Sequence, residues 1–579
     1  MKLKIHVTQL FNRNHNLETD YTKKFLTIRF RVYLCLLLIT FGINISQSLF
    51  SQVIYEKTAV SSDSLREYTY QLGSDRFQGR GTGTEGAAAA AEYISSKLNE
   101  YGIHTLGSGL SYYQNIPMHG SHPLKSSRFI LRVDHSDTLL ELGKDYLLYK
   151  TGAETYIPNP TSLVFVGYGI IAPEFDYNDY LSVDVQGKVV IFLSGEPYSE
   201  DENFFKGTKP TIYSYPEAKQ RLAISRGAVG SIMIQTMGRG DQLNWAHWVQ
   251  EFAFENVTLA YTVSSHMSAL LNPAMATLIF SGSRYSYKDV LKMQSQGTIS
   301  SFELESQVSF IGEFEERDFV GRNLIGIVEG SDNNLKDSYI ILSAHYDHLG
   351  IGPPVKGDSI YNGVMDNALG VSALLEISRI ISHLELKPKR SIIFLFLTGE
   401  EKGLLGSKYY TDHPARPLYK TVADVNIDGI AAFDEFRDII GVGAEFSSLQ
   451  DDLVTVSESL DLEVSSTPEV YFYESENISR SDQFSFMKAG VPSVLITEGL
   501  NYKNTTYQQG LDRLIRWTEK VYHTPFDDLN QSLNFKAAEE HTQLILKFSL
   551  YLANKTVAPQ WKPGSPYINA QLQSIAEKR

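Results

Sequence analysis

The segment SYIILSAHYDHLG at residues 338–350 combines an apolar run with two histidines and an aspartate that follow it closely. Further along the chain, SIIFLFLTGEEKGLLGS at 391–407, TVADVNIDGI at 421–430 and GVPSVLITEGL at 490–500 also end in acidic residues. Short, wholly apolar runs of this kind are typical of buried parallel strands. The four segments therefore predict strands with charged residues at their ends.

A predicted helix, NALGVSALLEISRIISHLEL at 367–386, lies between the first two runs and carries its apolar residues on one face. Asp366 and Asn367 stand at its start and are candidate N-cap residues. Strand, helix and strand joined by right-handed crossovers form an open α/β sheet, whose ligand site lies outside the carboxyl ends of the strands. The charged residues at those ends are His345, Glu400, Glu401 and Asp428.

Composition limits the possible functions. A chain of 579 residues that is 42% hydrophobic is too long for one core and predicts two domains or more. Its net charge of −15 argues against nucleic-acid binding, because binding to phosphates needs a basic surface. The single cysteine, Cys35, lies within an early apolar run. A metal in the rest of the chain must therefore be held by histidine and carboxylate.

The N-terminal region resembles a secretory signal peptide with a long basic n-region. Lysines and arginines precede the apolar run VYLCLLLITFGINI at 32–45, and polar SQSLFSQ follows it. The run is short for a membrane span. We expect residues 1–52 to be removed and the mature protein to be secreted or periplasmic, with an uncleaved membrane anchor as the alternative.

The remaining chain divides by composition into four parts. Residues 53–117 are helical, and residues 118–317 contain short β-type runs broken by Gly, Pro and Asp, which predict an inserted β-rich α+β domain without a spaced set of metal ligands. Strand and helix alternate over 318–557. The Pro-rich tail, 558–579, is expected to wrap loosely around the fold.

A glycine motif occurs in the helical part. Gly81, Gly83 and Gly86 satisfy G-x-G-x-x-G before an alanine-rich helix. Dinucleotide binding would require a buried strand before the motif, whereas the preceding LREYTYQLGSD is polar and helix-like. A glycine turn that leads into a helix is the favoured interpretation.

A metal site without thiols can be assembled from the charged residues. Two divalent ions held about 3.5–4 Å apart need one bridging carboxylate and about two further His or carboxylate ligands each. Each candidate also has a structural alternative when taken alone, such as the N-cap role of Asp366 or a solvated turn for Glu400 and Glu401. Adjacent acids point in different directions, however, so one can bind metal while the other faces the substrate. The candidate ligands are His345, Asp366, Glu401, Asp428 and His523.

The order and wording of six segments resemble the di-zinc peptidase family of bacterial leucyl aminopeptidases and glutamate carboxypeptidases. These segments are SAHYDHLG, YNGVMDNALGV, FLFLTGEEKGLLGS, NIDGI, RSDQFSFMKAGVPSV and VYHTPFDDL. The likeness covers about 318–555 and, more weakly, 79–101. The insertion is similar to a protease-associated domain, most clearly in VFVGYGI and GKVVIF.

The resemblance implies a zinc exopeptidase fold, a mixed and largely parallel sheet flanked by helices, with two Zn²⁺ ions. It implies that Asp366 bridges the ions, that His345 and Asp428 hold one, and that Glu401 and His523 hold the other. The other roles that it implies are a general base at Glu400, a residue that orients the His345 ring at Asp347, an oxyanion donor at Tyr522, and a substrate-side loop with Arg480 and Asp482.

The expected function is a zinc-dependent aminopeptidase that removes N-terminal residues from peptides. A carboxypeptidase acting on acidic peptides would share every metal ligand, and a catalytically silent peptidase-like binding module is an alternative of another class. We expect peptide substrates as partners, no nucleic acid, and no stable membrane partner after signal cleavage.

Overall fold

The computed structural model describes residues 59–106, 111–148, 155–201, 203–205, 207, 211–236, 245–468 and 480–576. The expected signal segment, 1–52, lies outside this range. Within the described residues, none of the helices combines the length and the apolar character needed to cross a membrane.

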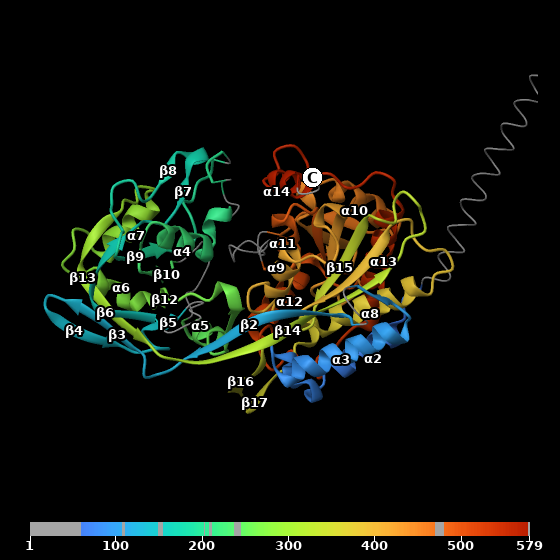
Figure 1. The fold of residues 1–579 in the computed structure, drawn as a ribbon, viewed down its shortest axis with the longest axis horizontal. Helices are drawn as coiled ribbons and strands as arrows, with labels where there is room; N and C mark the ends of the chain where they lie inside the picture. The colour runs from blue at the N-terminus through green and yellow to red at the C-terminus, as the bar shows by residue number, and fades with distance from the viewer. Residues whose placement is uncertain are drawn as a thin grey trace, which may run out of the picture. The chain divides into compact units, whose positions relative to one another are not determined.

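The four apolar runs lie in the first main sheet (Figure 1). Its strands, in spatial order, are β11 (Asn256–Leu259), β2 (Tyr113–Pro123), β14 (Phe314–Val328), β18 (Ser391–Leu397), β15 (Tyr339–His345), β19 (Thr421–Asn426), β22 (Ser493–Glu498), β20 (Asp438–Val442) and β21 (Glu463–Ser465), with β1 (His104–Thr105) paired to β14. Pairing is parallel from β18 through β22 and between β20 and β21, and antiparallel elsewhere. The prediction of a mixed α/β sheet is confirmed, with parallel pairing concentrated at its centre.

Helices cover both faces of this sheet, which explains why its central strands are apolar throughout. Ile340 and Leu342 of β15 belong to one hydrophobic cluster, whereas Ile341 between them belongs to another. The first cluster includes residues of α2 (Ser62–Leu72), α3 (Glu85–Glu100), α8 (Leu369–Ser382), α10 (Leu449–Glu458) and α13 (Phe535–Asn554). The second includes residues of α9 (Leu405–Asp412) and α11 (Gln483–Lys488). Successive side chains of a strand point to opposite faces, so both must be apolar here.

The N-cap interpretation of Asp366 and Asn367 is wrong. Helix α8 begins at Leu369, and its N-cap, Ala368, makes no side-chain capping hydrogen bond. The Asn367 amide instead donates to the carbonyl of Ile427, 2.8 Å away. Asn367 therefore binds the backbone that follows β19, and Asp366 faces His345 at the end of β15, so that neither side chain caps the helix.

A second sheet is built from residues between Arg128 and Gly312. Its strands, in spatial order, are β4 (Ser136–Leu140), β3 (Arg128–Val133), β13 (Phe302–Gly312), β6 (Thr155–Phe165), β9 (Val189–Leu193), β10 (Gly230–Ile234), β12 (Met267–Leu271) and β5 (Tyr146–Leu148). The same range contains α4 (Pro216–Ser225), α5 (Trp245–Glu251), α6 (Pro273–Ile279) and α7 (Tyr287–Ser295), and the small pair β7 (Ile171–Ala172) and β8 (Tyr177–Asn178). This sheet has hydrophobic clusters of its own.

The predicted insertion contributes strands to the first sheet as well as to the second. Strand β11 lies within the 118–317 range but pairs with β2 in the first sheet, where Val257 faces Gly120. Strands β2 and β14 cross the expected boundaries and pair along their length. The boundaries at 118 and 317 stay predictions, and these strands run across them.

The C-terminal tail packs closely, contrary to the expected loose wrap. Trp561 and Tyr567 are buried and belong to a cluster with Met487. The Trp561 indole donates a hydrogen bond to the carbonyl of Gly490 at 3.1 Å. The chain then forms α14 (Ile568–Ala576). Two large aromatic side chains bury enough apolar area to hold a Pro-rich segment in place.

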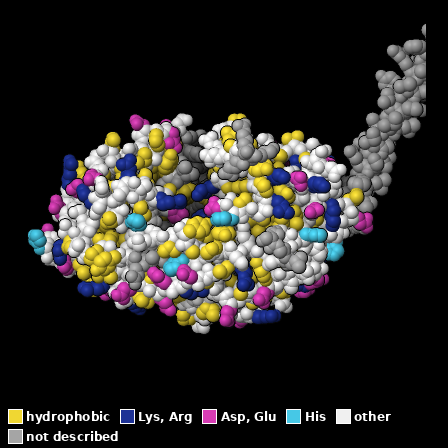
Figure 2. All heavy atoms as spheres, in the orientation of Figure 1, with side chains coloured by type: hydrophobic (Ala, Val, Ile, Leu, Met, Phe, Trp, Pro, Cys, Tyr) yellow, Lys and Arg dark blue, Asp and Glu magenta, His cyan; other side chains and the backbone are white. Residues whose placement is uncertain are grey.

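Further elements include the 3₁₀ turn η1 (Asp75–Arg80), the hairpin of β16 (Gly350–Val355) and β17 (Asp358–Tyr361), and helix α12 (Tyr507–Lys520). On the face shown in Figure 2, acidic and basic side chains are interspersed.

Candidate metal centre

The parallel strands bring the predicted ligands to one edge of the first sheet. His345 is the last residue of β15, and the Glu400–Glu401 pair follows the end of β18 closely. Asp428 comes two residues after β19. Asp366 lies between the β16–β17 hairpin and α8, and His523 follows α12. The five candidate ligands therefore meet, although they are spread over much of the sequence.

Asp366 stands between the two histidines. Its Oδ1 lies 3.3 Å from Nε2 of His345, and its Oδ2 lies 3.4 Å from Nε2 of His523. The His345 Nε2 is also 3.1 Å from Oδ1 of Asp428. The His523 Nε2 is 3.2 Å from Oε2 of Glu401. Each oxygen of one carboxylate thus belongs to a separate group of possible ligands.

These four separations suit metal coordination better than direct ion pairing. Charged N–H···O hydrogen bonds are usually about 2.7–2.9 Å long. Two atoms bound at about 2.0–2.1 Å to a tetrahedral zinc lie about 3.3 Å from each other. Within the described part of the chain, the buried Nε2 of His523 has no hydrogen-bond partner. A divalent ion on each side of Asp366 would satisfy it, so the residues present fit a pair of zinc ions.

His348 is a contributor that we did not expect from the sequence. Its Nδ1 lies 2.5 Å from Oε1 of Glu401 and 3.9 Å from Oδ2 of Asp366. The first contact is a short hydrogen bond, and His348, Asp366 and Glu401 also form a group that could hold a metal ion. His348 therefore fixes one oxygen of Glu401, while the other oxygen faces His523. The second histidine of SAHYDHLG was the signal for it.

Asp527 holds the backbone of the Asp366 loop. Its fully buried carboxylate accepts hydrogen bonds from the amides of Met365 at 2.9 Å and Asp366 at 3.0 Å. The Asp527 carbonyl accepts from the amide of Val364 at 3.1 Å. Three hydrogen bonds to Asp527 thus fix the backbone of the loop that carries Asp366.

Arg80, directly before the glycine motif, also contacts the segment that leads to Asp366. Its buried guanidinium donates to the carbonyls of Tyr346 at 2.8 Å, Asn362 at 2.6 Å and Gly363 at 2.7 Å, and also to Leu72. Burial lowers the pKa of Arg80 to about 10, which leaves it charged at neutral pH. Five N–H donors in a rigid fork suit this role.

The glycine motif as a whole therefore packs beside the candidate site and is not preceded by a strand. Thr82 donates to Oδ2 of Asp347 at 2.6 Å. Gly79 has φ +64°, and a Cβ there would lie 2.3 Å from the carbonyl oxygen of Tyr361. The favoured interpretation of a turn before a helix describes it correctly, since α3 begins at Glu85.

Glu400 is placed beside the two groups of ligands and is almost wholly buried. Its backbone amide donates to Oδ1 of Asp347 at 3.3 Å. Burial raises the pKa of the Glu400 carboxyl well above its usual value. The Nδ1 of His345 faces the Asp347 carbonyl oxygen at 3.1 Å, whereas the nearest Asp347 carboxylate oxygen is 4.0 Å away. Asp347 therefore reaches the imidazole through its backbone.

Tyr522, Arg480 and Asp482 differ in their contacts and in their exposure to solvent. The Tyr522 ring stacks on the ring of His523, with centroids 3.8 Å apart. Arg480 is exposed, whereas Asp482 has no exposed surface, and burial raises the pKa of Asp482 to about 7. A buried carboxylate suits support of the site better than contact with a substrate. The roles of these two residues stay predictions.

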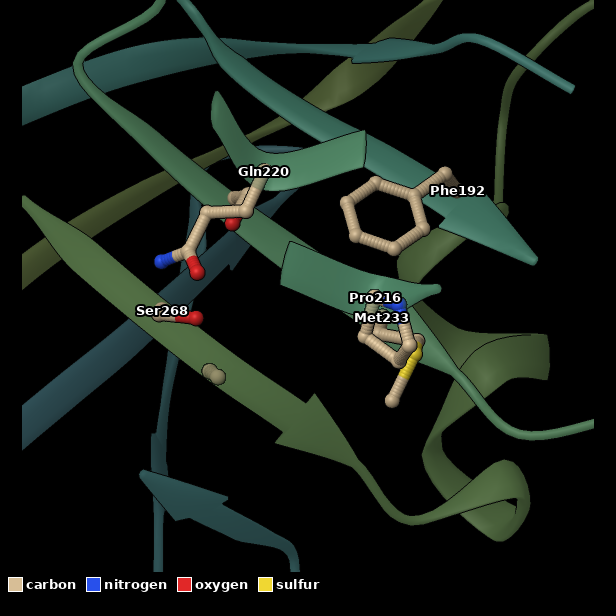
Figure 3. Close-up of a pocket in the computed structure, with 7 residues that line it drawn as sticks. Phe192, Pro216, Gln220, Met233 and Ser268 are labelled. Atoms are coloured by element: carbon tan, nitrogen blue, oxygen red, sulfur yellow. The ribbon is translucent and has the colours of Figure 1, made fainter. Parts of the chain in front are cut away.

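A small pocket lies elsewhere, among strands of the second sheet and α4 (Figure 3). Its lining residues are Phe192, Pro216, Gln220, Ser231, Met233, Ser268 and Ala269. None of these is a histidine or a carboxylate, so it offers no ligand of the kind found around Asp366.

We expect Arg80→Met to destabilise the protein by at least about 3 kcal/mol. The change leaves three buried carbonyls without this donor, since the Gly363 carbonyl still accepts from the Ala368 amide, and each such group costs about 1–3 kcal/mol. Thermal unfolding measures the loss. Arg128→Met, at an exposed position, is the matched control and should unfold like the wild type. Equal melting temperatures for both variants would show that the Arg80 contacts contribute little to stability.

Comparison with known proteins agrees with the geometry. Residues 323–549 match the profile of peptidase family M28. Leupeptin-inactivating enzyme 1 of Streptomyces exfoliatus is 27% identical over 259 residues, which are 43% of this chain and 52% of that protein. Aminopeptidase NAALADL1 of Mus musculus is 35% identical over 129 residues, which are 21% of this chain and 15% of that protein. The chain thus spans about half the length, or less, of these curated relatives.

A solved structure shares the fold. The aminopeptidase from Aneurinibacillus sp. strain AM-1 superposes with a TM-score of 0.52 at 18% identity, over 88% of this chain and 97% of that one. The resemblance to a peptidase family that the sequence suggested is confirmed over the matched residues. Residues 323–549 of this chain are thus similar to peptidase family M28.

Proposed function

We propose that this protein is a zinc-dependent aminopeptidase that removes residues from the N-terminus of peptides and works with two zinc ions. The observation that carries the proposal is the pair of imidazoles facing the two oxygens of Asp366 at 3.3 and 3.4 Å. His345 and Asp428 would hold one ion, His523 and Glu401 the other, and Asp366 both. When bound, the ions would lower the pKa of water and polarise the substrate carbonyl.

Glu400 is the general base in this proposal. It takes the proton of the attacking water and later gives it to the leaving amine. A raised pKa suits both steps, because the carboxyl must accept a proton and then release it. The hydrogen bond from its own amide to Asp347 fixes the start of the Glu400–Glu401 turn.

Tyr522 supplies a hydrogen bond to the oxyanion that develops on the substrate carbonyl. Burial raises the pKa of its phenol well above the usual value, so the hydroxyl keeps its proton. Stacking on the His523 ring ties its position to a ligand. Preorganised donors of this kind stabilise charge that appears in the transition state.

The amino-terminal direction of cleavage is supported by the relative that is called an aminopeptidase, Aminopeptidase NAALADL1 of Mus musculus. We further propose that Arg480 lies along the path of the substrate and that Asp482 supports this side of the site. We also propose that residues 118–317 form a protease-associated domain. Segment 1–52 would direct export, so that the mature protein is secreted or periplasmic.

The proposal is tested with aminoacyl and peptide substrates that have either a free or an acetylated α-amino group. We expect hydrolysis of the free amines only, loss of activity on removal of metal by a chelator, and recovery with zinc. Cleavage of N-acetylated acidic peptides from the carboxyl end would instead identify a carboxypeptidase. Absence of both zinc and turnover would identify a binding module.

Glu400→Gln should keep its zinc but lose turnover by about 10²–10⁴-fold, because the amide cannot accept the proton of water. Asp366→Ala should lose zinc as well as activity, since it removes the ligand shared by both ions. Metal content and kcat are measured for both variants. Glu458→Gln, at an exposed position on α10, makes the same chemical change away from the site and should be inert. A Glu400→Gln enzyme with normal kcat would contradict the assigned role.

Tyr522→Phe should lower kcat by about 10²–10³-fold, as expected for loss of one oxyanion donor. KM should change less, because the donor acts mainly in the transition state. The ring is kept, so the melting temperature should stay near that of the wild type. Tyr507→Phe, an exposed tyrosine on α12, serves as the control. A variant that melts lower yet has normal kcat would identify Tyr522 as a packing residue.

A further inference from the structure

A carboxylate from the second-sheet region reaches the candidate metal centre. Oε1 of Glu251 lies 3.1 Å from Nδ1 of His523, although the two residues are far apart in sequence. Glu251 is the last residue of α5. We propose that Glu251 is a positioning residue, which orients the His523 imidazole for zinc and makes the metal site depend on the insertion. The inference rests on the proposed function.

The chemistry of imidazole gives this contact its meaning. A neutral imidazole carries a proton on one nitrogen and a lone pair on the other. Nε2 of His523 faces Asp366 and Glu401, so its lone pair must be free to bind an ion. The proton then lies on Nδ1 and is donated to Glu251. A carboxylate in this place fixes the tautomer and increases the basicity of the ligand nitrogen.

The ring of His523 is restrained in two directions. Tyr522 stacks on its face, with ring planes 22° apart, and Glu251 accepts a hydrogen bond at its edge. The backbone at His523 has φ 54°, in the left-handed region. Residues other than glycine are uncommon there, so this conformation costs free energy that surrounding contacts must offset. Glu251 is one of those contacts.

Glu251 is itself held between two anchored stretches of one segment. Before it, Trp245 and Trp248 pack against a hydrophobic cluster of the second sheet, and the Trp245 indole donates to the carbonyl of Gly143 at 3.0 Å. After it, the ring of Phe254 meets the ring of Tyr361 with centroids 4.9 Å apart. Strand β11 follows and pairs with β2 in the first sheet.

The segment thus crosses from one sheet to the other at the point where it offers its carboxylate to His523. A second carboxylate on the same segment has a different partner. Glu255 forms a two-pronged ion pair with Arg317 at 2.7 and 2.6 Å. It helps to dock the segment, and it lies only four residues from Glu251. This pair of acids provides a matched comparison between orienting the ligand and docking the segment.

The test is zinc affinity, measured by titrating the metal-free full-length protein in competition with a chelator of known affinity. Glu251→Ala should weaken binding of one of the two zinc ions by about 10–100-fold, the usual effect of losing such a partner. Glu251→Gln should lose less, because its amide oxygen still accepts the bond. Glu255→Ala should leave both zinc affinities unchanged. Thermal unfolding of the metal-free proteins should show no larger loss for Glu251→Ala than for Glu255→Ala.

Three outcomes would count against these ideas in distinguishable ways. Unchanged zinc affinity in Glu251→Ala would overturn the positioning role. Equal losses of affinity in Glu251→Ala and Glu255→Ala would also overturn it, because docking of the segment would then explain both. A wild-type protein that binds no zinc would instead refute the proposed function itself.

Discussion

The parallel register of β15, β18 and β19 is the constraint on which the rest of the site depends. His345 lies opposite Leu397 in this register, and Ser343 lies opposite Asn426. The three strands therefore end at the same edge of the sheet. Glu401 follows the end of β18, and Asp428 follows the end of β19, within a few residues. A slip of one residue would turn each buried side chain to the other face of the sheet. The apolar clusters on both faces exclude such a slip and so fix where the charged residues emerge.

Crowding of carboxylates is the cost of this arrangement. Asp347, Asp366, Glu400 and Asp527 are all buried close to the two histidines. Buried charges are tolerated only where they are paired or hydrogen-bonded, because loss of hydration costs several kcal/mol per ion. Here, two backbone amides donate hydrogen bonds to Asp527, and the Thr82 hydroxyl donates one to Asp347. The positive charge of the Arg80 guanidinium lies nearby. In the proposed enzyme, divalent cations would supply the remaining positive charge.

The sequence predicted the strands of the first sheet because buried strands leave local patterns. The candidate ligands that it named lie close together, and their roles as ligands stay predictions. A run such as IIFLFL followed by two acids marks a buried strand end, and four such runs in order are hard to produce by chance. Asp527 and Glu251 leave no pattern of this kind, since their importance comes only from contacts between distant parts of the chain. Asp366 illustrates a further limit, because an acid before a helix has the same local signature whether it caps the helix or faces a histidine. The packing of Trp561 was missed for the same reason, as a Pro-rich composition says nothing about a distant partner.

The pairing of β2 with β14 also bears on how the chain folds. Gly321 lies opposite Ile116, so this hairpin-like pair encloses the whole second sheet as its loop. Closing so long a loop costs only a few kcal/mol more than closing a short one if the loop is flexible, but such contacts form slowly. Prior collapse of the enclosed residues around their own apolar clusters would bring the two strands together and shorten the search. The first sheet would then be completed late. The edge of β18 would stay unpaired until β14 pairs with it, and misassembly during folding would begin at that edge.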